Sequence, residues 1–553
     1  MSVIAGSTAE LDRRDALWAI SSALIAFGIY AATMYPGLVG IGDTPKLQLV
    51  GAVLGTPHSP GYPLYVWLSW IFSRLPLGST VAFRVNLLSA VCSGAAIGIL
   101  SLVLRELSCR RLVAFAGALA IAFGHLFWSQ SLLAEVYALN VLLFSGVLLF
   151  LLRWSRSRRF GDLAWALAFF AAGLAHHLTL AMTAPALLAF ALMVDRHVIT
   201  TRTLRAALVA CVAGLSCYLF VWVRTHQQAP FLEARANTLS DLVGIVSARQ
   251  FSPALFRFSF RELVTERAPL VAAWLLSELR WGGVAGATVG AIWLAYLRRR
   301  DLVLLLGSAA AVMVFALNYD VYDVQVFLII PMVAFGLLAG AGLEALCRAA
   351  QALIRRGEML TRAGEARPGM PRSAAVGRLL TGTASIAVLI LPWAQLRANF
   401  KANNHRDHTF EAQYFDALFK ALPERSAIVA ESYTIDHMVL YKLLAEDCGR
   451  GRRIEVIPAD AGVVRRYISS GFAVFAFSNG RSELQFDVPF SVADLSLPTA
   501  PGVKQLAETE AQQLAYPLSV VTLDRRGTAG TTGAVPDRSP EPMTGAVWRP
   551  TAQ

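Results

Sequence analysis

Long apolar runs decide the fold, and residues 81–104 show their character: VAFRVNLLSAVCSGAAIGILSLVL, in which Arg84 is the one charged side chain. A helix rises about 1.5 Å per residue, so a run of this length crosses the roughly 30 Å of hydrocarbon in a lipid bilayer. A buried strand needs far fewer residues. This stretch therefore predicts a transmembrane helix.

Similar runs occur along most of the chain. Residues 162–194 are too long for one helix and are divided by His176 and His177, which predicts a hairpin. Residues 62–73 are too short to span and are expected to form an interfacial or re-entrant helix. No cleavage signal follows Tyr35, so the first span is expected to stay uncleaved. The predicted spans are 16–35, 81–104, 112–128, 132–152, 162–176, 178–194, 206–223, 281–297, 302–317, 324–346 and 379–396. We therefore expect a polytopic α-helical membrane protein with about eleven transmembrane helices.

The overall composition agrees with this class. Apolar types make up 56% of the 553 residues and charged types 16%, compared with about 45–50% and about 25% in soluble domains. These proportions exclude a purely soluble enzyme, a disordered chain and a disulfide scaffold. The six cysteines show neither a paired framework nor a metal-binding spacing.

Arginine residues distinguish the two sides of the predicted membrane segments. With the N-terminus in the cytoplasm, every inner loop contains a group of Arg, whereas the short outer turns 129–131, 177 and 318–323 contain no Lys or Arg. Cytoplasmic loops normally carry this excess, so the asymmetry sets the orientation. It also accounts for the net charge of +12 without a nucleic-acid partner. Loops 36–80 and 224–280 then lie outside.

The C-terminal part of the chain has a different pattern. Helical patterns at 407–422 and 434–446 alternate with short apolar runs at 427–430, 454–457, 472–477 and 518–523. Such alternation predicts a small α/β domain over 398–523, outside the cytoplasm, after a transmembrane domain over 1–397. Residues 524–553 are rich in Gly, Thr, Pro and Arg, and we expect them to be disordered.

Unusual polar side chains concentrate on the predicted outer side. Asp43 is the first acid after the first span, and three prolines stiffen the segment around His58. Glu135 is a carboxylate among apolar neighbours, which is costly unless it is paired or functional. Arg84 has the geometry to hold a phosphate. We expect an outward-facing cavity at which six side chains converge: Asp43, His58, Arg84, Glu135, His176 and Asp320.

Ordinary structural roles remain open for the same residues. Asp43 would then cap a helix, His58 would be a solvated loop residue, and Arg84 would extend toward lipid headgroups. Of the adjacent His176 and His177, at most one is expected to face a site. Asp320 would bind a metal, a sugar hydroxyl or a partner arginine, or lie in a solvated turn.

Several motifs, taken together, resemble one family. They are Gly42-Asp43-Thr44, His58-Ser59-Pro60-Gly61-Tyr62-Pro63, Phe83-Arg84-Val85-Asn86, Ala134-Glu135-Val136-Tyr137, Ala175-His176-His177-Leu178 and Tyr319-Asp320. This set resembles a family of bacterial membrane proteins whose animal relatives are protein O-mannosyltransferases, a branch of the GT-C glycosyltransferases. The resemblance covers most of residues 30–440. Relatives often follow the Asp with Ser-Gly-Glu, whereas this chain has Thr44-Pro45-Lys46 and lacks the second acid.

The resemblance implies a function, a fold and a location. The fold would be GT-C-like, and the location the bacterial inner membrane. The activity would transfer a sugar, with mannose one candidate, from a polyprenyl-phosphate carrier to an extracytoplasmic acceptor such as a protein hydroxyl or a glycan. A divalent cation, Mg²⁺ or Mn²⁺, is left open.

The resemblance also implies roles for individual residues. Asp43 would be the general base, with burial raising its pKa toward neutrality, and Glu135 would hold the sugar or assist Asp43. The expected phosphate ligands are Arg84, His58 and Lys46. The expected substrate-binding residues are Tyr62, His176, His177, Tyr319 and Asp320.

Two functions of other classes remain open. A transporter or flippase would suit the many spans, but the sequence shows no internal repeat and no pair of matching discontinuous helices. A non-catalytic scaffold of cell-envelope assembly would suit the missing second acid. Substrate flux without sugar transfer would favour the transporter, and partner binding by the 398–523 segment would favour the scaffold.

Overall fold

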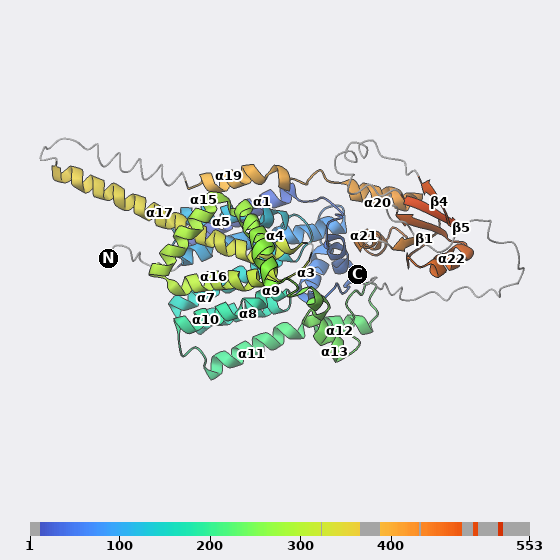
Figure 1. The fold of residues 1–553 in the computed structure, drawn as a ribbon, viewed down its shortest axis with the longest axis horizontal. Helices are drawn as coiled ribbons and strands as arrows, with labels where there is room; N and C mark the ends of the chain where they lie inside the picture. Colours follow the sequence, from blue (N-terminus) through green and yellow to red (C-terminus); the bar gives the residue numbers. More distant parts are fainter. Residues whose placement is uncertain are drawn as a thin grey trace, which may run out of the picture.

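The computed structural model describes residues 11–321, 323–364, 388–430, 433–477, 490–495 and 518–523. Helices form one elongated body, and a β-sheet lies at one end of it (Figure 1). The longest helices are α1 (Arg13–Thr33), α4 (Val81–Glu106), α7 (Tyr137–Ser157), α15 (Ala268–Leu297), α16 (Arg299–Leu317) and α17 (Ile329–Gly364). The predicted short helix at 62–73 is α3 (Pro63–Ser73).

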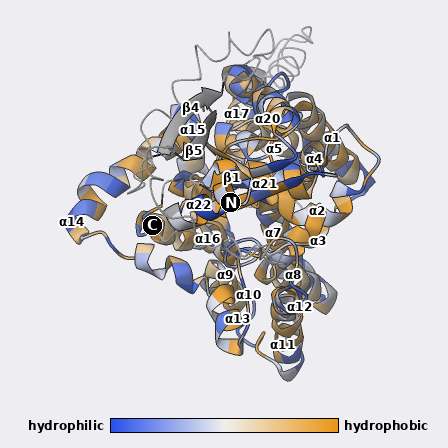
Figure 2. Cartoon of the chain, turned by 90° about the vertical axis from the view of Figure 1, so that its right-hand side faces the viewer, coloured by the Kyte–Doolittle hydropathy of each residue, from blue (hydrophilic) through white to orange (hydrophobic). Residues whose placement is uncertain are grey.

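Shorter helices complete the body. They are α2 (Thr44–Val53), α5 (Arg111–Ala122), α6 (His125–Ser129), α8 (Phe160–Leu174), α9 (Leu178–Met182), α10 (Ala184–Val194), α11 (Thr201–Ser216), α12 (Leu219–His226), α13 (Leu239–Val246), α14 (Phe260–Glu262) and α19 (Ile390–Asn399). Apolar side chains such as Leu17 of α1 and Leu208 of α11 are exposed at 63% and 64%, and hydrophobic residues predominate along the helices in Figure 2. An apolar outer surface is what a lipid-facing helix requires.

Within the described residues, six helical segments are long and apolar enough to cross a membrane. They are Arg13–Thr33, Val81–Glu106, Tyr137–Ser157, Thr201–His226, Arg299–Leu317 and Val324–Leu353. The predicted spans at 112–128, 162–176 and 178–194 correspond to shorter apolar helices, and the first half of the span at 379–396 lies outside the described residues. The chain is thus a multi-pass helical membrane protein, and the number of about eleven spans remains a prediction.

The arginines predicted to be cytoplasmic gather at one end of the helices. Arg105 and Arg111 bind Asp15 Oδ1 at 2.7 and 2.8 Å, and Arg348 binds Glu344 at 2.7 Å. Both carboxylates are fully buried. A buried charge is costly unless it is paired, so Asp15 ties α1 to α4 and α5, and Arg110 at the start of α5 ties that helix to α17 through Glu344 at 3.1 Å. The predicted site residues lie toward the opposite end, where α1 runs out into loop 36–80.

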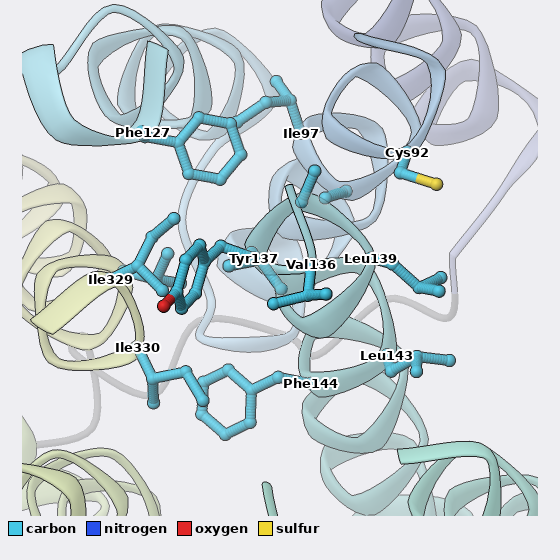
Figure 3. Packing of buried hydrophobic residues seen from close by; sticks show 14 of the residues in the cluster. Cys92, Ile97, Phe127, Val136, Tyr137, Leu139, Leu143, Phe144, Ile329 and Ile330 are labelled. Atoms are coloured by element: carbon cyan, nitrogen blue, oxygen red, sulfur yellow. The ribbon is translucent and has the colours of Figure 1, made fainter. Parts of the chain in front are cut away.

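Buried apolar packing fixes the start of α7. Tyr137 and Phe144 of α7 lie beside Ile329 and Ile330 of α17 (Figure 3), and all four side chains are at most 7% exposed. Close packing of this kind leaves little freedom to the chain that enters the helix. The segment that precedes α7, which contains Glu135, is therefore held in place.

Five strands form one mixed sheet. They are β1 (Arg425–Ala430), β2 (Arg453–Pro458), β3 (Ala473–Phe477), β4 (Phe490–Leu495) and β5 (Leu518–Leu523), in the order β2-β1-β3-β5-β4. β1 is parallel to β2 and β3, whereas β5 is antiparallel to β3 and β4. Four of these strands lie where the apolar runs predicted them. The predicted disordered tail, 524–553, lies outside the described residues.

Two helices lie between this sheet and the helical body, α20 (Phe410–Ala421) and α21 (Tyr433–Leu444) (Figure 1). α21 connects β1 to β2, the crossover that parallel strands require, and α22 (Ala461–Ser469) connects β2 to β3. The Tyr441 hydroxyl accepts a hydrogen bond from the Ala82 backbone N at 2.8 Å. α21 thereby docks directly on the start of α4.

Candidate active site

A cavity of about 2290 Å³ lies where the ends of the helices meet α21 and β2. Loops that are far apart in the sequence supply its walls. Six of the predicted site residues line it: Asp43, His58, Tyr62, Glu135, His177 and Tyr319. The structure therefore brings together acids and imidazoles that sequence patterns alone placed on one membrane side.

Lys46 is the centre of the polar network beside this cavity. Its side chain is fully buried, and α2 places it one helical turn after Asp43, so the two side chains meet. Its Nζ atom has four neighbours: Asp43 Oδ1 at 2.9 Å, His58 Nδ1, the Tyr433 hydroxyl, and Glu233 Oε2 at 3.4 Å. Burial by itself would lower the pKa of Lys46, but the carboxylates of Asp43 and Glu233 raise it. Lys46 is therefore a charged ammonium enclosed by acceptors.

The expectation that Asp43 has a raised pKa is wrong. Burial by itself would raise the pKa, but the Lys46 ammonium and the hydrogen bonds from Lys46 and Tyr433 hold it well below the ordinary range for Asp. The side chain is 35% exposed. It stands at the N-cap position of α2 yet makes no capping hydrogen bond. Asp43 is thus an ionised carboxylate that faces the cavity and does not cap the helix.

Glu135, and not Asp43, is the carboxylate of this pair whose pKa is raised. Burial raises it, and the negative charges of Asp43 and Asp323 raise it further. Thr44, next to Asp43 in the chain, donates its hydroxyl to Glu135 Oε1 at 3.1 Å. Two neighbouring carboxylates, one with a lowered pKa and the other with a raised pKa, are typical of an acid–base pair.

His58 is a neutral imidazole, and its contacts indicate which ring nitrogen carries the proton. Burial lowers its pKa, and the Lys46 ammonium lowers it further. An ammonium can only donate, so His58 Nδ1 accepts from Lys46 and the proton lies on Nε2. Nε2 is 3.2 Å from the Tyr62 hydroxyl and 3.5 Å from Asp43 Oδ2. The side chain is 12% exposed, so it is not a solvated loop residue.

The histidine pair divides as expected. His177 lines the cavity and stacks on Tyr62, with ring centroids 5.8 Å apart. His176 is fully buried and its Nε2 lies 2.8 Å from the Val136 carbonyl oxygen, so it does not line the cavity. Burial lowers the pKa of His176 to about 4 and that of His177 to about 3. Both rings are therefore neutral at physiological pH.

Two predicted residues lie elsewhere. Arg84 does not line the cavity, because its Nε donates to the Ser73 carbonyl at 2.8 Å, at the end of α3. Asp320 is exposed and forms an ion pair with Arg257 at 3.3 Å. Four other guanidinium groups line the cavity: that of Arg235 comes from loop 224–280, and those of Arg452, Arg453 and Arg466 come from the sheet end of the chain.

Glu233 and Tyr433 are site residues that the sequence analysis missed. Glu233 Oε2 accepts from the His58 backbone N at 3.0 Å and lies beside Lys46. The Tyr433 hydroxyl is 3.0 Å from Asp43 Oδ1 and 3.2 Å from Glu233 Oε1. The one available signal was Lys46 itself, because a lysine in the place of the expected acid requires a further acid nearby. Nothing in the sequence pointed to Tyr433.

A divalent cation does not fit between these carboxylates. In the part of the chain that the structure describes, no group of three His, Cys, Asp or Glu side chains is arranged to hold a metal ion. The Lys46 ammonium already occupies the space between Asp43 and Glu233. No step is therefore assigned to a metal.

Comparisons with known proteins identify relatives of one part of the chain. Residues 43–200 match the model of the N-terminal domain of the protein O-mannosyl-transferase TMEM260. The chain is 31% identical over 144 residues to the protein O-mannosyl-transferase tmem260 of Dictyostelium discoideum, and 36% identical over 122 residues to TMEM260 of Mus musculus. These matches cover 26% and 22% of this chain and 17% of each relative.

The fold is similar to that of a solved membrane protein. ArnT from Cupriavidus metallidurans, crystallised with undecaprenyl phosphate, superimposes with a TM-score of 0.58 over 93% of this chain and 99% of ArnT, at 13% identity. Its apo structure gives a TM-score of 0.53. At such identity the match concerns the fold alone. Residues 43–200 are therefore similar to the N-terminal domain of the protein O-mannosyl-transferase TMEM260, and the helical fold of the chain is similar to that of ArnT.

Proposed function

We propose that the chain is a membrane glycosyltransferase that moves a sugar from a polyprenyl-phosphate carrier to an acceptor hydroxyl outside the cytoplasm of a bacterium. The observation that carries the proposal is the pair Asp43 and Glu135, two acids at one cavity with pKa values shifted in opposite directions. The family match over residues 43–200 and the fold shared with a protein that binds undecaprenyl phosphate support it. The segment 398–523 would form one wall of the site from the outer side.

Asp43 is proposed as the group that receives the acceptor proton. Its Oδ1 is held by Lys46 and Tyr433, whereas Oδ2, which lies 3.5 Å from His58 Nε2, is the oxygen proposed to accept from an acceptor hydroxyl. The acceptor oxygen attacks the anomeric carbon, the bond from that carbon to the phosphate oxygen breaks, and the configuration inverts. A carboxylate with a lowered pKa is a weak base, so its charge also acts on the oxocarbenium-like transition state. Glu135 would hold a sugar hydroxyl beside it.

The leaving phosphate requires a cation, and Arg235 is proposed for that role in place of Arg84. We expect Arg235→Ala to raise the KM for the lipid-linked donor about tenfold, because a charge-assisted hydrogen bond contributes about 1.5–3 kcal/mol. Arg84→Ala is the matched control and is expected to change that KM by less than about twofold, since Arg84 binds the Ser73 carbonyl. Donor titrations with both variants would refute the assignment if the effects were reversed.

Tyr433 is proposed to orient Asp43 from the C-terminal part of the chain. Its hydroxyl, on α21, contacts both Asp43 and Glu233. We expect Tyr433→Phe to lower kcat about tenfold with little change in donor KM. The acid limb of the pH–rate profile of this variant should move to higher pH, because the variant lacks a hydrogen bond that lowers the pKa of Asp43. An unchanged pH–rate profile would show that Tyr433 contributes packing and does not orient Asp43.

A reconstituted assay tests the function as a whole. Purified chain in liposomes, given undecaprenyl-phosphate-linked radiolabelled mannose and a threonine-containing peptide, is expected to label the peptide. Other lipid-linked hexoses serve as parallel donors. Movement of the donor across the bilayer with no label in any acceptor would overturn the proposal and favour a flippase. Neither transfer nor flux with any donor would favour a scaffold.

A further inference from the structure

One edge of the sheet belongs to the wall of the active-site cavity. β2 is the terminal strand, with β1 as its neighbour in the sheet. Every residue from Arg452 to Ala459 lines the cavity that also contains Asp43. Successive side chains of a strand point to opposite faces. A run of consecutive lining residues therefore means that the backbone edge itself faces the cavity.

The hydrogen-bonding groups on that edge can be assigned. In a parallel strand, the N–H and C=O of one residue point to the same side, and successive residues alternate. Arg453 N donates to the Glu424 carbonyl at 2.7 Å, on the β1 side. Ile454 and Val456 therefore point their N–H and C=O groups toward the cavity. Pro458 occupies the next outward position and has no N–H, which limits the edge to these two donors.

The exposed edge leads to the catalytic group. β1 and β2 are parallel, and Ala430 pairs with Pro458 at their carboxyl ends. Tyr433 follows Ala430 by three residues, so the end of β2 lies within roughly 15 Å of Tyr433, whose hydroxyl is 3.0 Å from Asp43. Ligands of α/β sheets bind at the carboxyl ends of parallel strands. A chain added along β2 would run toward Asp43.

The cavity is larger than a sugar phosphate requires. Its volume of about 2290 Å³ exceeds the roughly 300–1,000 Å³ of small-molecule pockets. Alternating N–H and C=O groups at the spacing of a strand match another polypeptide backbone, and a glycan has no such pattern. The ring of Phe472 and the side chains of Val463 and Tyr467 line the same wall, where they would meet side chains of a bound strand.

We propose that β2 binds an extended polypeptide segment of the acceptor as an added strand, and that this strand presents a Ser or Thr hydroxyl to Asp43. The transfer step rests on the proposed function, whereas the binding step does not. Main-chain pairing supplies affinity without strict sequence specificity. Acceptors would then share an extended, accessible Ser/Thr-containing segment more than a sequence motif.

The variant Val456→Pro tests the binding step. It removes one outward N–H and leaves the inward groups that pair with β1, whereas the control Val456→Ala keeps every backbone donor. Binding of a fluorescent threonine-containing heptapeptide, measured by anisotropy without donor lipid, is expected to weaken about tenfold in Val456→Pro and by less than about twofold in Val456→Ala, which loses side-chain atoms but no backbone donor. Equal binding by wild type and a folded Val456→Pro protein would overturn the proposal.

The peptide backbone gives a second test that leaves the protein unchanged. N-methylation of alternate amides removes either the donors that face β2 or those that face away. We expect one of the two methylated sets to abolish binding and the other to leave it intact, and equal effects of both sets would contradict pairing with β2. Peptide binding with this pattern but no sugar transfer would contradict the proposed function alone.

Discussion

Asp43→Asn is expected to reduce sugar transfer about 10³-fold, within the range that a general base contributes. Asn has nearly the same shape, but it has neither the negative charge that stabilises the transition state nor the capacity to accept the acceptor proton. Asp43 is the ionised member of the acid pair, and its Oδ2 is the oxygen proposed to face the acceptor. Initial rates with a lipid-linked sugar, at saturating acceptor, measure the effect.

The control for that experiment is Asp320→Asn. Asp320 is also an acid from the same predicted membrane side, but it is exposed and paired with Arg257. Its replacement is expected to change the rate by less than about twofold, because an exposed ion pair contributes about 0–1 kcal/mol. Both variants should elute as folded protein in detergent. Near-wild-type transfer by Asp43→Asn would remove Asp43 from the mechanism.

Lys46→Met is expected to be the most destabilising single change at the site. It leaves the carboxylates of Asp43 and Glu233 without their common cation, and removing one partner of a buried ion pair costs about 3–5 kcal/mol. Because Asp43 is 35% exposed, the lower end of that range applies. Thermal unfolding in detergent should show a clear loss, whereas Lys401→Met, at an exposed lysine, should not.

The same variant changes the pH dependence in a defined direction. In the wild type the pKa of Asp43 is lowered, so its pairing with Lys46 stabilises the fold above about pH 4 and is lost as the pH falls through the lowered pKa. Without Lys46, burial dominates and the pKa rises. The acid limb of the pH–rate profile should therefore move to higher pH. A double variant, Lys46→Met with Glu233→Gln, should recover part of the stability, and an unmoved acid limb would show that Asp43 does not depend on Lys46.

Much of the fold and part of the site follow from sequence patterns. The apolar run at 81–104 forms α4, and the arginines at 105 and 111 gather at one end of the helices, as their positions in the sequence predicted. Asp43, His58 and Glu135 were identifiable because they are unusual polar residues in a loop or at the end of a span, all on the side of the membrane that the sequence predicts to be the outer one. The hydropathy pattern points to such positions, because a charged side chain beside or within an apolar span costs free energy and is kept mainly where it has a function.

The features of the site that the sequence did not predict depend on contacts between distant segments. Tyr433 reaches Asp43 across 390 residues, and no local pattern predicts such a contact. The pKa of Asp43 depends on whether the Lys46 ammonium faces a ligand or the carboxylate, which is a property of tertiary packing. Arg84 was misplaced because the sequence does not indicate toward which neighbouring helix the first turn of α4 points.

A structure of the full chain with undecaprenyl phosphate bound tests the central proposal most directly. We predict that the phosphate lies inside the cavity, within hydrogen-bonding distance of Arg235 and on the side of Asp43 that carries the Oδ2 oxygen. The prenyl chain should leave the cavity between helices toward the bilayer. A phosphate bound outside the cavity, or one held by Arg84 at a distance from Asp43, would contradict the assignment of this site as the place of sugar transfer.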